Sequence, residues 1–294
     1  MAIEWKKSTN KGTAFLKLIH QFQQSVLFTD PYISWFFERS EIESVKNKFP
    51  DSLIQPKNEK EQFEFLVYWY VVLREKHGDR AIEAAIESGC KQLILLGAGY
   101  DTRLFRLDKI QENSVQTFEI DLPDTIEDKQ RYLSSKLSVM PRGLSLVPLD
   151  LNRDSLNRLD EYGFDDRVPT IYVWQGVSYY LERESISTTL DSIKRQMTPG
   201  SVFVFDCCSP LMTFKNDRIP GINANIEQLE KIGEPYRFGM YADEMERWLK
   251  EKGFAEIDTL QLNDLEEVFL NKKTFPENMW YENMWYIVTV KALG

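Results

Sequence analysis

Residues 93–103 read LILLGAGYDTR, and this stretch decides the fold. Together with Gln92, its first four residues form a short apolar run of strand length that ends at Gly97-Ala98-Gly99. Glycine lets the backbone turn sharply and approach a ligand closely. A strand that ends in such a turn predicts a ligand at the carboxyl edge of a sheet. The loop lacks the third glycine of the dinucleotide fingerprint, so a phosphate-cradling role is not favoured.

Six more runs of strand length follow, and helical stretches separate most of them. The runs are 115–120, 144–148, 170–174, 201–206, 256–260 and 285–293. Strand and helix in alternation predict an α/β fold with a mainly parallel sheet and helices on both faces. No helix follows the final run, so we expect that strand to be an antiparallel edge.

The first ninety residues are helical in pattern. Apolar residues recur at helical spacing over 13–25 and cover almost every side of 62–76, so the second helix is expected to be buried. Asp79 is placed to cap a further helix over 81–88. We therefore expect residues 1–80 to form an N-terminal helical cap.

Residues 81–294 are expected to form the core of a single compact domain. Its fifth strand is followed by a long insertion, 207–240, and then by a helix near 241–252. The pentapeptide ENMWY occurs twice in succession, at 277–281 and at 282–286. We interpret it as a local duplication before the last strand, or as an aromatic wall for a ligand.

Composition favours a cytoplasmic globular protein. No apolar run approaches the roughly 20 residues of a membrane span, and the N-terminus lacks the pattern of a signal peptide. The net charge of −10, from 36 basic and 46 acidic residues, argues against a nucleic-acid partner. The three cysteines, Cys90, Cys207 and Cys208, lack metal-ligand spacing and are expected to be reduced thiols.

Polar residues close the strands that follow the glycine turn. Asp121 ends the second strand, Asp150 follows the third and Gln175 follows the fourth. A carboxylate at the position of Asp121 can accept hydrogen bonds from both hydroxyls of a ribose, and Asp150 can accept one from an adenine amino group. Because parallel strands bring these ends to one edge of the sheet, the spacing predicts a nucleoside site.

The chain resembles a known family at these positions. Four segments match, in order, the motifs of the leucine carboxyl methyltransferase family: LILLGAGYDTRLFRL, TFEIDLPDTIEDKQRYL, LVPLDLN and WQGVSYYLERESISTTLDSIKRQMTPGSVFVFD. The resemblance runs from about residue 28 to the end, and GAGYDTR is its most specific part. It implies a Rossmann-like class I methyltransferase sheet of seven strands, with an antiparallel last strand and S-adenosyl-L-methionine as cofactor.

The resemblance also implies roles for single residues. Gly97 and Gly99 would pack against the methionyl part of the cofactor, and Arg74 would pair with its carboxylate through a bidentate guanidinium. Asp121 would hold the ribose. The remaining contacts, to the adenine, would come from Asp150 and the backbone of Leu151.

Three further positions of the motifs leave alternatives open. Gln175 stands where the family's protein phosphatase methyltransferases carry Glu, so a negative charge beside the cofactor is absent here. Asp101 and Arg103 belong to the motif, and they either form a structural ion pair or contact the ligand directly.

The sequence says less about the molecule that accepts the methyl group than about S-adenosyl-L-methionine, which donates it. A carboxylate acceptor predicts a cationic clamp and no base, whereas a hydroxyl acceptor predicts a base. His77, three residues after Arg74, is a candidate base or a partly exposed histidine at a helix end. The insertion carries both signs of charge: Lys215, Asp217, Arg218, Glu227, Glu230, Lys231, Glu234 and Arg237.

We therefore expect an O-methyltransferase acting on a hydroxyl of a small natural product, as a monomer or homodimer and without a bound metal. A carboxyl methyltransferase acting on a small molecule or a protein C-terminus is the alternative. An NAD-dependent oxidoreductase is disfavoured by the missing glycine, and a non-catalytic binding protein would keep the same pocket.

Overall fold

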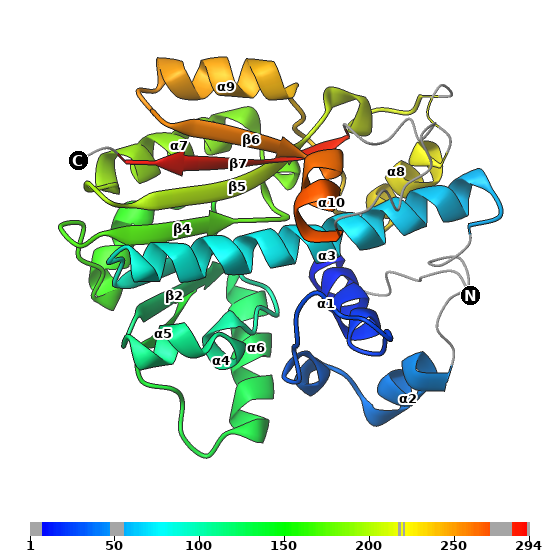
Figure 1. The fold of residues 1–294 in the computed structure, drawn as a ribbon, viewed down its shortest axis with the longest axis horizontal. Coiled ribbons are helices and arrows are strands. Elements are labelled where there is room, and N and C mark those ends of the chain that lie inside the picture. Colours follow the sequence, from blue (N-terminus) through cyan, green and yellow to red (C-terminus); the bar gives the residue numbers. More distant parts are fainter. Residues whose placement is uncertain (1–7, 48–55, 217–218, 220, 271–283, 293–294) are drawn as a thin grey trace.

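The computed structural model of the chain describes residues 8–47, 56–216, 219, 221–270 and 284–292. Within these residues seven strands form one sheet, in the order β3-β2-β1-β4-β5-β7-β6 (Figure 1). Their bounds are β1 Gln92–Leu96, β2 Gln116–Asp121, β3 Leu144–Pro148, β4 Thr170–Trp174, β5 Val202–Cys208, β6 Ile257–Gln261 and β7 Trp285–Lys291. The first five run parallel, and β7 pairs antiparallel with both β5 and β6.

Helices precede, connect and follow the strands. The α-helices are α1 Thr9–His20, α2 Arg39–Asn47, α3 Glu59–Glu87, α4 Arg103–Arg106, α5 Asp108–Glu112, α6 Pro123–Lys136, α7 Arg183–Gln196, α8 Ile222–Lys231, α9 Ala242–Glu251 and α10 Leu262–Leu270. Short 3-10 helices are η1 Ile33–Phe36, η3 Leu156–Tyr162, η4 Ser178–Tyr180 and η5 Pro210–Met212.

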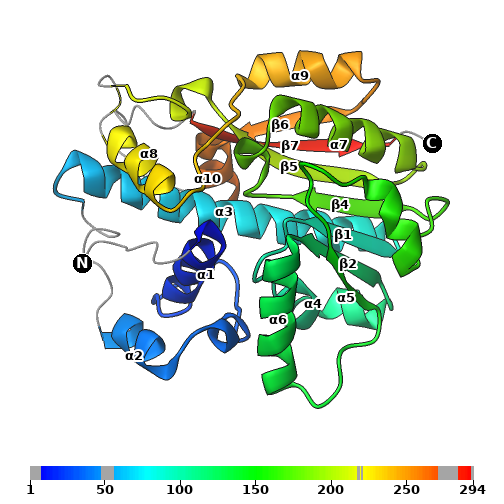
Figure 2. The same ribbon diagram turned by 180° about the vertical axis from the view of Figure 1, so that it is seen from behind.

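The two faces of the sheet are covered by different helices (Figures 1 and 2). Side chains alternate along a strand, so Ile94 and Leu96 of β1 pack in one cluster with α7 and α9, while Leu93 and Leu95 pack with α3 and α5. The chain turns from β1 towards β2 on one side and later enters β4 on the other. The carboxyl ends of β1 and β4 therefore flank the switch point, where open sheets of this kind bind ligands.

The predicted sheet is confirmed, with one correction. The first, third and fourth strands have the bounds expected from the sequence, and the others differ by one or two residues. The last strand is antiparallel as expected, but it is not an edge. It lies between β5 and β6 because its backbone pairs on both sides and most of its residues are buried.

The N-terminal helices differ from the sequence-based expectation. Helix α1 begins at Thr9, because the Ser8 side chain accepts a hydrogen bond from the Lys11 N–H at 3.3 Å and caps the helix. The two helices expected over 62–76 and 81–88 are one helix of 29 residues, α3. Asp79 does not cap it; its carboxylate is buried and pairs with arginines. A domain boundary at residue 80 therefore falls inside a continuous helix.

The structure also shows the surroundings of the three cysteines and of part of the repeat. Cys90, Cys207 and Cys208 are free and buried, as expected for reduced thiols. The first ENMWY copy lies outside the described residues, as do the first two residues of the second copy. In the second copy, Trp285 stacks on Tyr70 with centroids 5.0 Å apart and is only 2% exposed. This tryptophan therefore belongs to the core.

Candidate functional site

Two neighbouring cavities lie at the carboxyl ends of the strands. The Arg74 cavity is lined by Asn10, Thr13, Ala14, Lys17, Arg74, Glu75, 95–101, Arg103, Val173, Gln175 and Gly176. The Asp121 cavity, of about 270 Å³, is lined by Thr9, Asn10, Gly97, 120–122, 149–152, Gly176, Val177, Tyr180, Leu181, 233–235 and Arg237. Three residues line both: Asn10, Gly97 and Gly176.

The glycine turn after β1 requires its glycines. Gly97 has φ +68° and Gly99 has φ +48°, a region that residues with a Cβ rarely adopt. A Cβ on Gly97 would lie 2.2 Å from Cγ2 of Val177, and one on Gly99 would lie 3.1 Å from Oδ1 of Asn10. The turn thus brings the backbone against both cavities.

Asp121 is buried at the end of β2 and is held by the glycine turn. Its Oδ2 accepts from the Gly99 N–H at 2.7 Å, and its Oδ1 accepts from the Leu122 N–H at 2.8 Å. Burial raises the pKa of this carboxyl above its ordinary value, although the two backbone N–H groups counteract the effect. These bonds, with a further one from the Thr125 side chain, fix the carboxylate where it lines the cavity.

Asp150 and Leu151 follow β3 and line the same cavity as Asp121. Asp150 Oδ1 accepts from the Asn152 N–H at 2.9 Å, and its own N–H donates to Asp154 Oδ2 at 2.9 Å. The turn after β3 is therefore ordered by its own side chains. The structure brings together the two acidic residues that the sequence places at consecutive strand ends.

Arg74 projects from α3 into the other cavity and is held by two partners. Its Nη1 donates to Asp206 Oδ2 at 2.9 Å and to the Tyr179 hydroxyl at 3.0 Å. Asp206 also accepts from the Tyr70 hydroxyl at 2.8 Å and from the Gly176 N–H at 2.7 Å. This fully buried carboxylate therefore orients the guanidinium and the backbone after β4.

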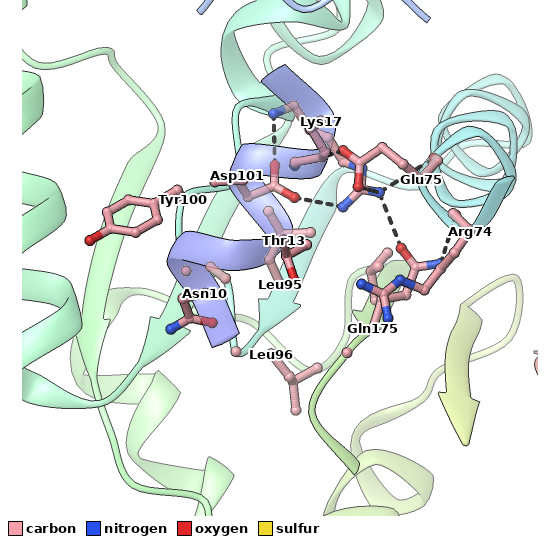
Figure 3. Close-up of a pocket in the computed structure, with 17 residues that line it drawn as sticks. Asn10, Thr13, Lys17, Arg74, Glu75, Leu95, Leu96, Tyr100, Asp101 and Gln175 are labelled. Carbon is pink, nitrogen blue, oxygen red and sulfur yellow. Dashed lines mark hydrogen bonds and ion pairs between the residues drawn. The ribbon is translucent and has the colours of Figure 1, made fainter. Parts of the chain in front are cut away.

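Gln175 bridges the two sides of the Arg74 cavity (Figure 3). Its Nε2 donates to the Arg74 carbonyl at 3.1 Å, and its Oε1 accepts from Arg103 Nη2 at 3.1 Å. The amide uses both of its ends, whereas a glutamate here could not donate to the carbonyl. A neutral side chain at this position thus fits its neighbours.

A network of buried charges surrounds the cavity. Arg103 pairs with Asp101 at 2.6 Å and with Asp79 at 2.9 Å, and its neighbour Glu75 pairs with Lys17 at 3.2 Å. Burial alone would raise the pKa of Glu75, but the three surrounding cations hold it well below its usual range. Asp101 and Arg103 form an ion pair and also line the cavity, so both open alternatives are compatible with their positions.

His77 does not face either cavity. Its Nε2 lies 3.2 Å from the Thr289 hydroxyl of β7, and its ring meets Phe269 of α10 edge-on. Burial lowers the pKa of His77 to about 4. Although it lies one turn after Arg74, its side chain points to the other flank of α3. Of the two alternatives for His77, the geometry therefore does not support a base facing the site, and the residue is not at a helix end either, because α3 continues to Glu87.

Sequence reasoning missed the contribution of α1. Asn10, Thr13 and Lys17 lie on this helix and line the Arg74 cavity (Figure 3). Their spacing of three and four residues marks one helical face, but no strand end signals it. Asp206 was also missed, although it ends an apolar run as Asp121 does.

Four described residues of the insertion, 233–235 and Arg237, line the Asp121 cavity. Glu234 Oε2 accepts hydrogen bonds from the Thr9 N–H, at 2.8 Å, and from the Thr9 hydroxyl. Both residues line the Asp121 cavity, together with Tyr180 and Arg237. Arg237 is half exposed and pairs with Glu182 at 2.6 Å. Helix α1 and the insertion thus meet over the cavity.

The strand order and antiparallel seventh strand define a class I methyltransferase fold. The chain belongs to the leucine carboxyl methyltransferase family, whose model matches residues 11–194, well over half of the chain. It is an S-adenosyl-L-methionine-dependent methyltransferase.

Similar proteins agree with this class. YktD of Bacillus subtilis, named as a proposed S-adenosyl-L-methionine-dependent methyltransferase, is 30% identical over 225 residues, 74% of this chain and 71% of that protein. A Streptomyces avermitilis protein with the same proposed activity is 28% identical over 231 residues, 78% of this chain and 79% of that protein.

Solved structures support the fold. A proposed methyltransferase of Thermobifida fusca superposes with a TM-score of 0.59 at 14% identity, covering 96% of this chain and 94% of the other. A DUF574 family protein of Streptomyces avermitilis gives a TM-score of 0.56 at 12% identity, covering 95% and 96%.

None of the described helices is long and apolar enough to cross a membrane. The described residues contain no group of three or more His, Cys, Asp or Glu side chains arranged to hold a metal ion.

Proposed function

We propose that the two cavities together bind S-adenosyl-L-methionine, with its nucleoside in the Asp121 cavity and its amino-acid end in the Arg74 cavity. One observation carries this proposal: a buried carboxylate, Asp121, and a buried guanidinium, Arg74, line two adjoining cavities that share the glycine turn. One end of the cofactor carries ribose hydroxyls, and the other carries a carboxylate. The polarity of the two cavities suits these two ends.

At the nucleoside end, Asp121 accepts hydrogen bonds from the ribose hydroxyls, and Asp150 with the backbone of Leu151 holds the adenine. Asp121 is already oriented by two backbone N–H groups, so binding does not require it to move. Its position in the cavity lining, bonded to the glycine turn, supports this role.

At the amino-acid end, Arg74 binds the carboxylate, and Gly97 and Gly99 provide a surface without side chains for the methionyl chain. Asp206 and Tyr179 hold Arg74 in place, which lowers the entropy lost when a ligand is bound. Gln175 contributes by fixing the backbone of Arg74 and the guanidinium of Arg103.

The bound cofactor supplies an electrophilic methyl group on a sulfonium. We further propose that the acceptor is a hydroxyl of a small natural product. A carboxylate acceptor calls for a cationic clamp, yet the cation that the described insertion residues add to the cavity, Arg237, is paired with Glu182. Glu234 on the same side would repel an anion. These charges favour a neutral acceptor, which enters between helix α1 and the described residues of the insertion that line the Asp121 cavity.

Calorimetry with S-adenosylhomocysteine and with NAD tests the binding proposal. We expect binding of the first alone, loss of it in Asp121→Ala, and an unchanged melting temperature for that ligand-free variant. Unchanged binding in Asp121→Ala would refute the ribose assignment.

A second experiment tests the acceptor class. The protein is incubated with methyl-labelled cofactor and panels of alcohols, phenols and carboxylic acids. We expect label in a base-stable ether product. Base-labile label would identify a methyl ester and support the carboxyl methyltransferase alternative.

A further inference from the structure

The place of the transferable methyl group follows from the connectivity of the cofactor. Its sulfur is bonded to the ribose at one side and to the methionyl chain at the other. If these parts occupy the Asp121 and Arg74 cavities, the sulfur lies where the cavities join. The residues that line both cavities, Asn10, Gly97 and Gly176, mark that junction.

The other two residues are glycines, so Asn10 provides the side chain at the junction. It lies in the first turn of α1 (Figure 3), and its Oδ1 lies 3.1 Å from the position that a Cβ of Gly99 would take. Within the described part of the chain, its side-chain amide makes no hydrogen bond and is partly buried. A polar group in this state is available to a ligand.

We propose that Asn10 is a specificity-determining residue that distinguishes S-adenosyl-L-methionine from S-adenosylhomocysteine through its amide oxygen; this inference rests on the proposed binding mode. The two ligands differ only in the methyl group and the positive charge on sulfur. A carbonyl dipole at the junction attracts the cation and accepts weak C–H···O contacts from the methyl group. The product lacks both features and is bound less strongly, which favours its release.

The test measures dissociation constants of both ligands by calorimetry, with no acceptor present. Asn10→Leu keeps the size of the side chain and removes the dipole. We expect it to weaken the methylated cofactor about three- to tenfold more than the demethylated product, the size of one ordinary hydrogen bond. Asn10→Asp replaces the dipole with a charge and should shift the ratio of the two constants in the opposite direction.

Thr13→Val is the matched control, because Thr13 also lies on α1 but lines only one of the two cavities, the Arg74 cavity. We expect it to change both constants by the same factor. Equal losses for the two ligands in Asn10→Leu, with no change of ratio in Asn10→Asp, overturn the proposal and indicate a purely structural role. Absence of binding by the unmodified protein instead defeats the proposed binding mode.

Discussion

Arg74 shows how a single residue is prepared for a ligand. Its guanidinium is 5% exposed and bonded to Asp206 and Tyr179, so it cannot turn away from the cavity. We expect Arg74→Ala to weaken S-adenosylhomocysteine roughly ten- to hundredfold, the loss of a hydrogen bond to a charged group. Adenosine, which lacks the carboxylate, should lose little affinity. Calorimetry with both ligands measures the difference.

The control for Arg74 must address the charge that the substitution leaves unpaired. Asp206 is fully buried, and removal of its partner is destabilising. Asp206→Asn keeps Arg74 and removes the counter-charge, so it should retain the preference for the carboxylate-bearing ligand. Ligand-free melting curves show whether each variant is folded. Equal losses of the two ligands in a folded Arg74→Ala variant contradict the assignment.

His20 predicts how stability depends on pH. Its Nε2 accepts from the Leu27 N–H at 2.8 Å and its Nδ1 lies 2.9 Å from the Tyr68 hydroxyl, so the buried ring is neutral. Burial lowers its pKa from 6.5 to about 4. Between these values the unfolded chain binds the proton more readily, so stability falls as the pH falls through this window. At pH 5 the loss is about 2 kcal/mol relative to pH 7.

Denaturant unfolding of the ligand-free protein at pH 7 and pH 5 measures this loss. In His20→Gln the amide oxygen can still accept from the Leu27 N–H, but it does not titrate. The variant should lose about 2 kcal/mol less than the parent between the two pH values. His77, whose pKa is also lowered, acts in the same direction and accounts for part of the remaining slope. Identical slopes in parent and variant contradict the prediction.

At the scale of elements, the strands were predictable and the cap helices were not. The strands are short apolar runs bounded by turn residues, so local pattern alone places Gln92–Leu96 and Thr170–Trp174. Helix α3 continues through Gly78 and Asp79, which look like a helix boundary in the sequence. Contacts distant in sequence decide the outcome: Asp79 pairs with Arg103, and a Cβ at Gly78 would lie 2.7 Å from Gln175.

The residues of the site divide in the same way: those at strand ends are predictable from the sequence, and those on helices are not. Asp121, Asp150, Gln175 and the glycine turn lie at strand ends, which share one edge of the sheet by the geometry of parallel strands. The sequence leaves two alternatives for His77 because spacing along a helix gives only the approximate direction of a side chain. The sequence offers no comparable rule for α1, whose place beside Arg74 depends on packing between segments far apart in the chain.

The strand-to-helix loop after β1 supports a prediction for this element. Gly97→Ala combines a positive φ with a Cβ placed 2.2 Å from Val177 Cγ2. Gly163 is the matched control, because it has φ +89° but a Cβ there would meet nothing within 4 Å. We expect Gly163→Ala to lower stability by about 1–2 kcal/mol and to leave binding unchanged.

In contrast, Gly97→Ala should also lower the affinity for S-adenosylhomocysteine at least tenfold, since the loop or Val177 must shift into the cavity. Calorimetry and denaturant unfolding on both variants separate the two effects. Unchanged affinity in Gly97→Ala, together with a stability loss equal to that of the control, rejects a role for close backbone approach.

At the scale of the whole molecule, helix α1 and the insertion meet at the Asp121 cavity. Thr9 and Glu234 are 225 residues apart in sequence, yet the Glu234 carboxylate accepts hydrogen bonds from both the backbone N–H and the hydroxyl of Thr9. Both residues line the Asp121 cavity. A ligand enclosed there leaves most easily when α1 and the insertion separate, so this contact should set the rate of cofactor exchange.

We expect Glu234→Ala to raise the dissociation rate of S-adenosylhomocysteine roughly tenfold, because it removes a charge-assisted contact worth about 1.5 kcal/mol or more. Thr9→Val removes only the hydroxyl and should have a smaller effect, and the double variant should release the ligand no faster than Glu234→Ala. Glu230→Ala is the matched control, since Glu230 is exposed on α8 and lies outside both cavities. Stopped-flow displacement measures the rates. Additive effects of the two substitutions would show that Thr9 and Glu234 act independently. A different contact between α1 and the insertion would then control the release of the ligand.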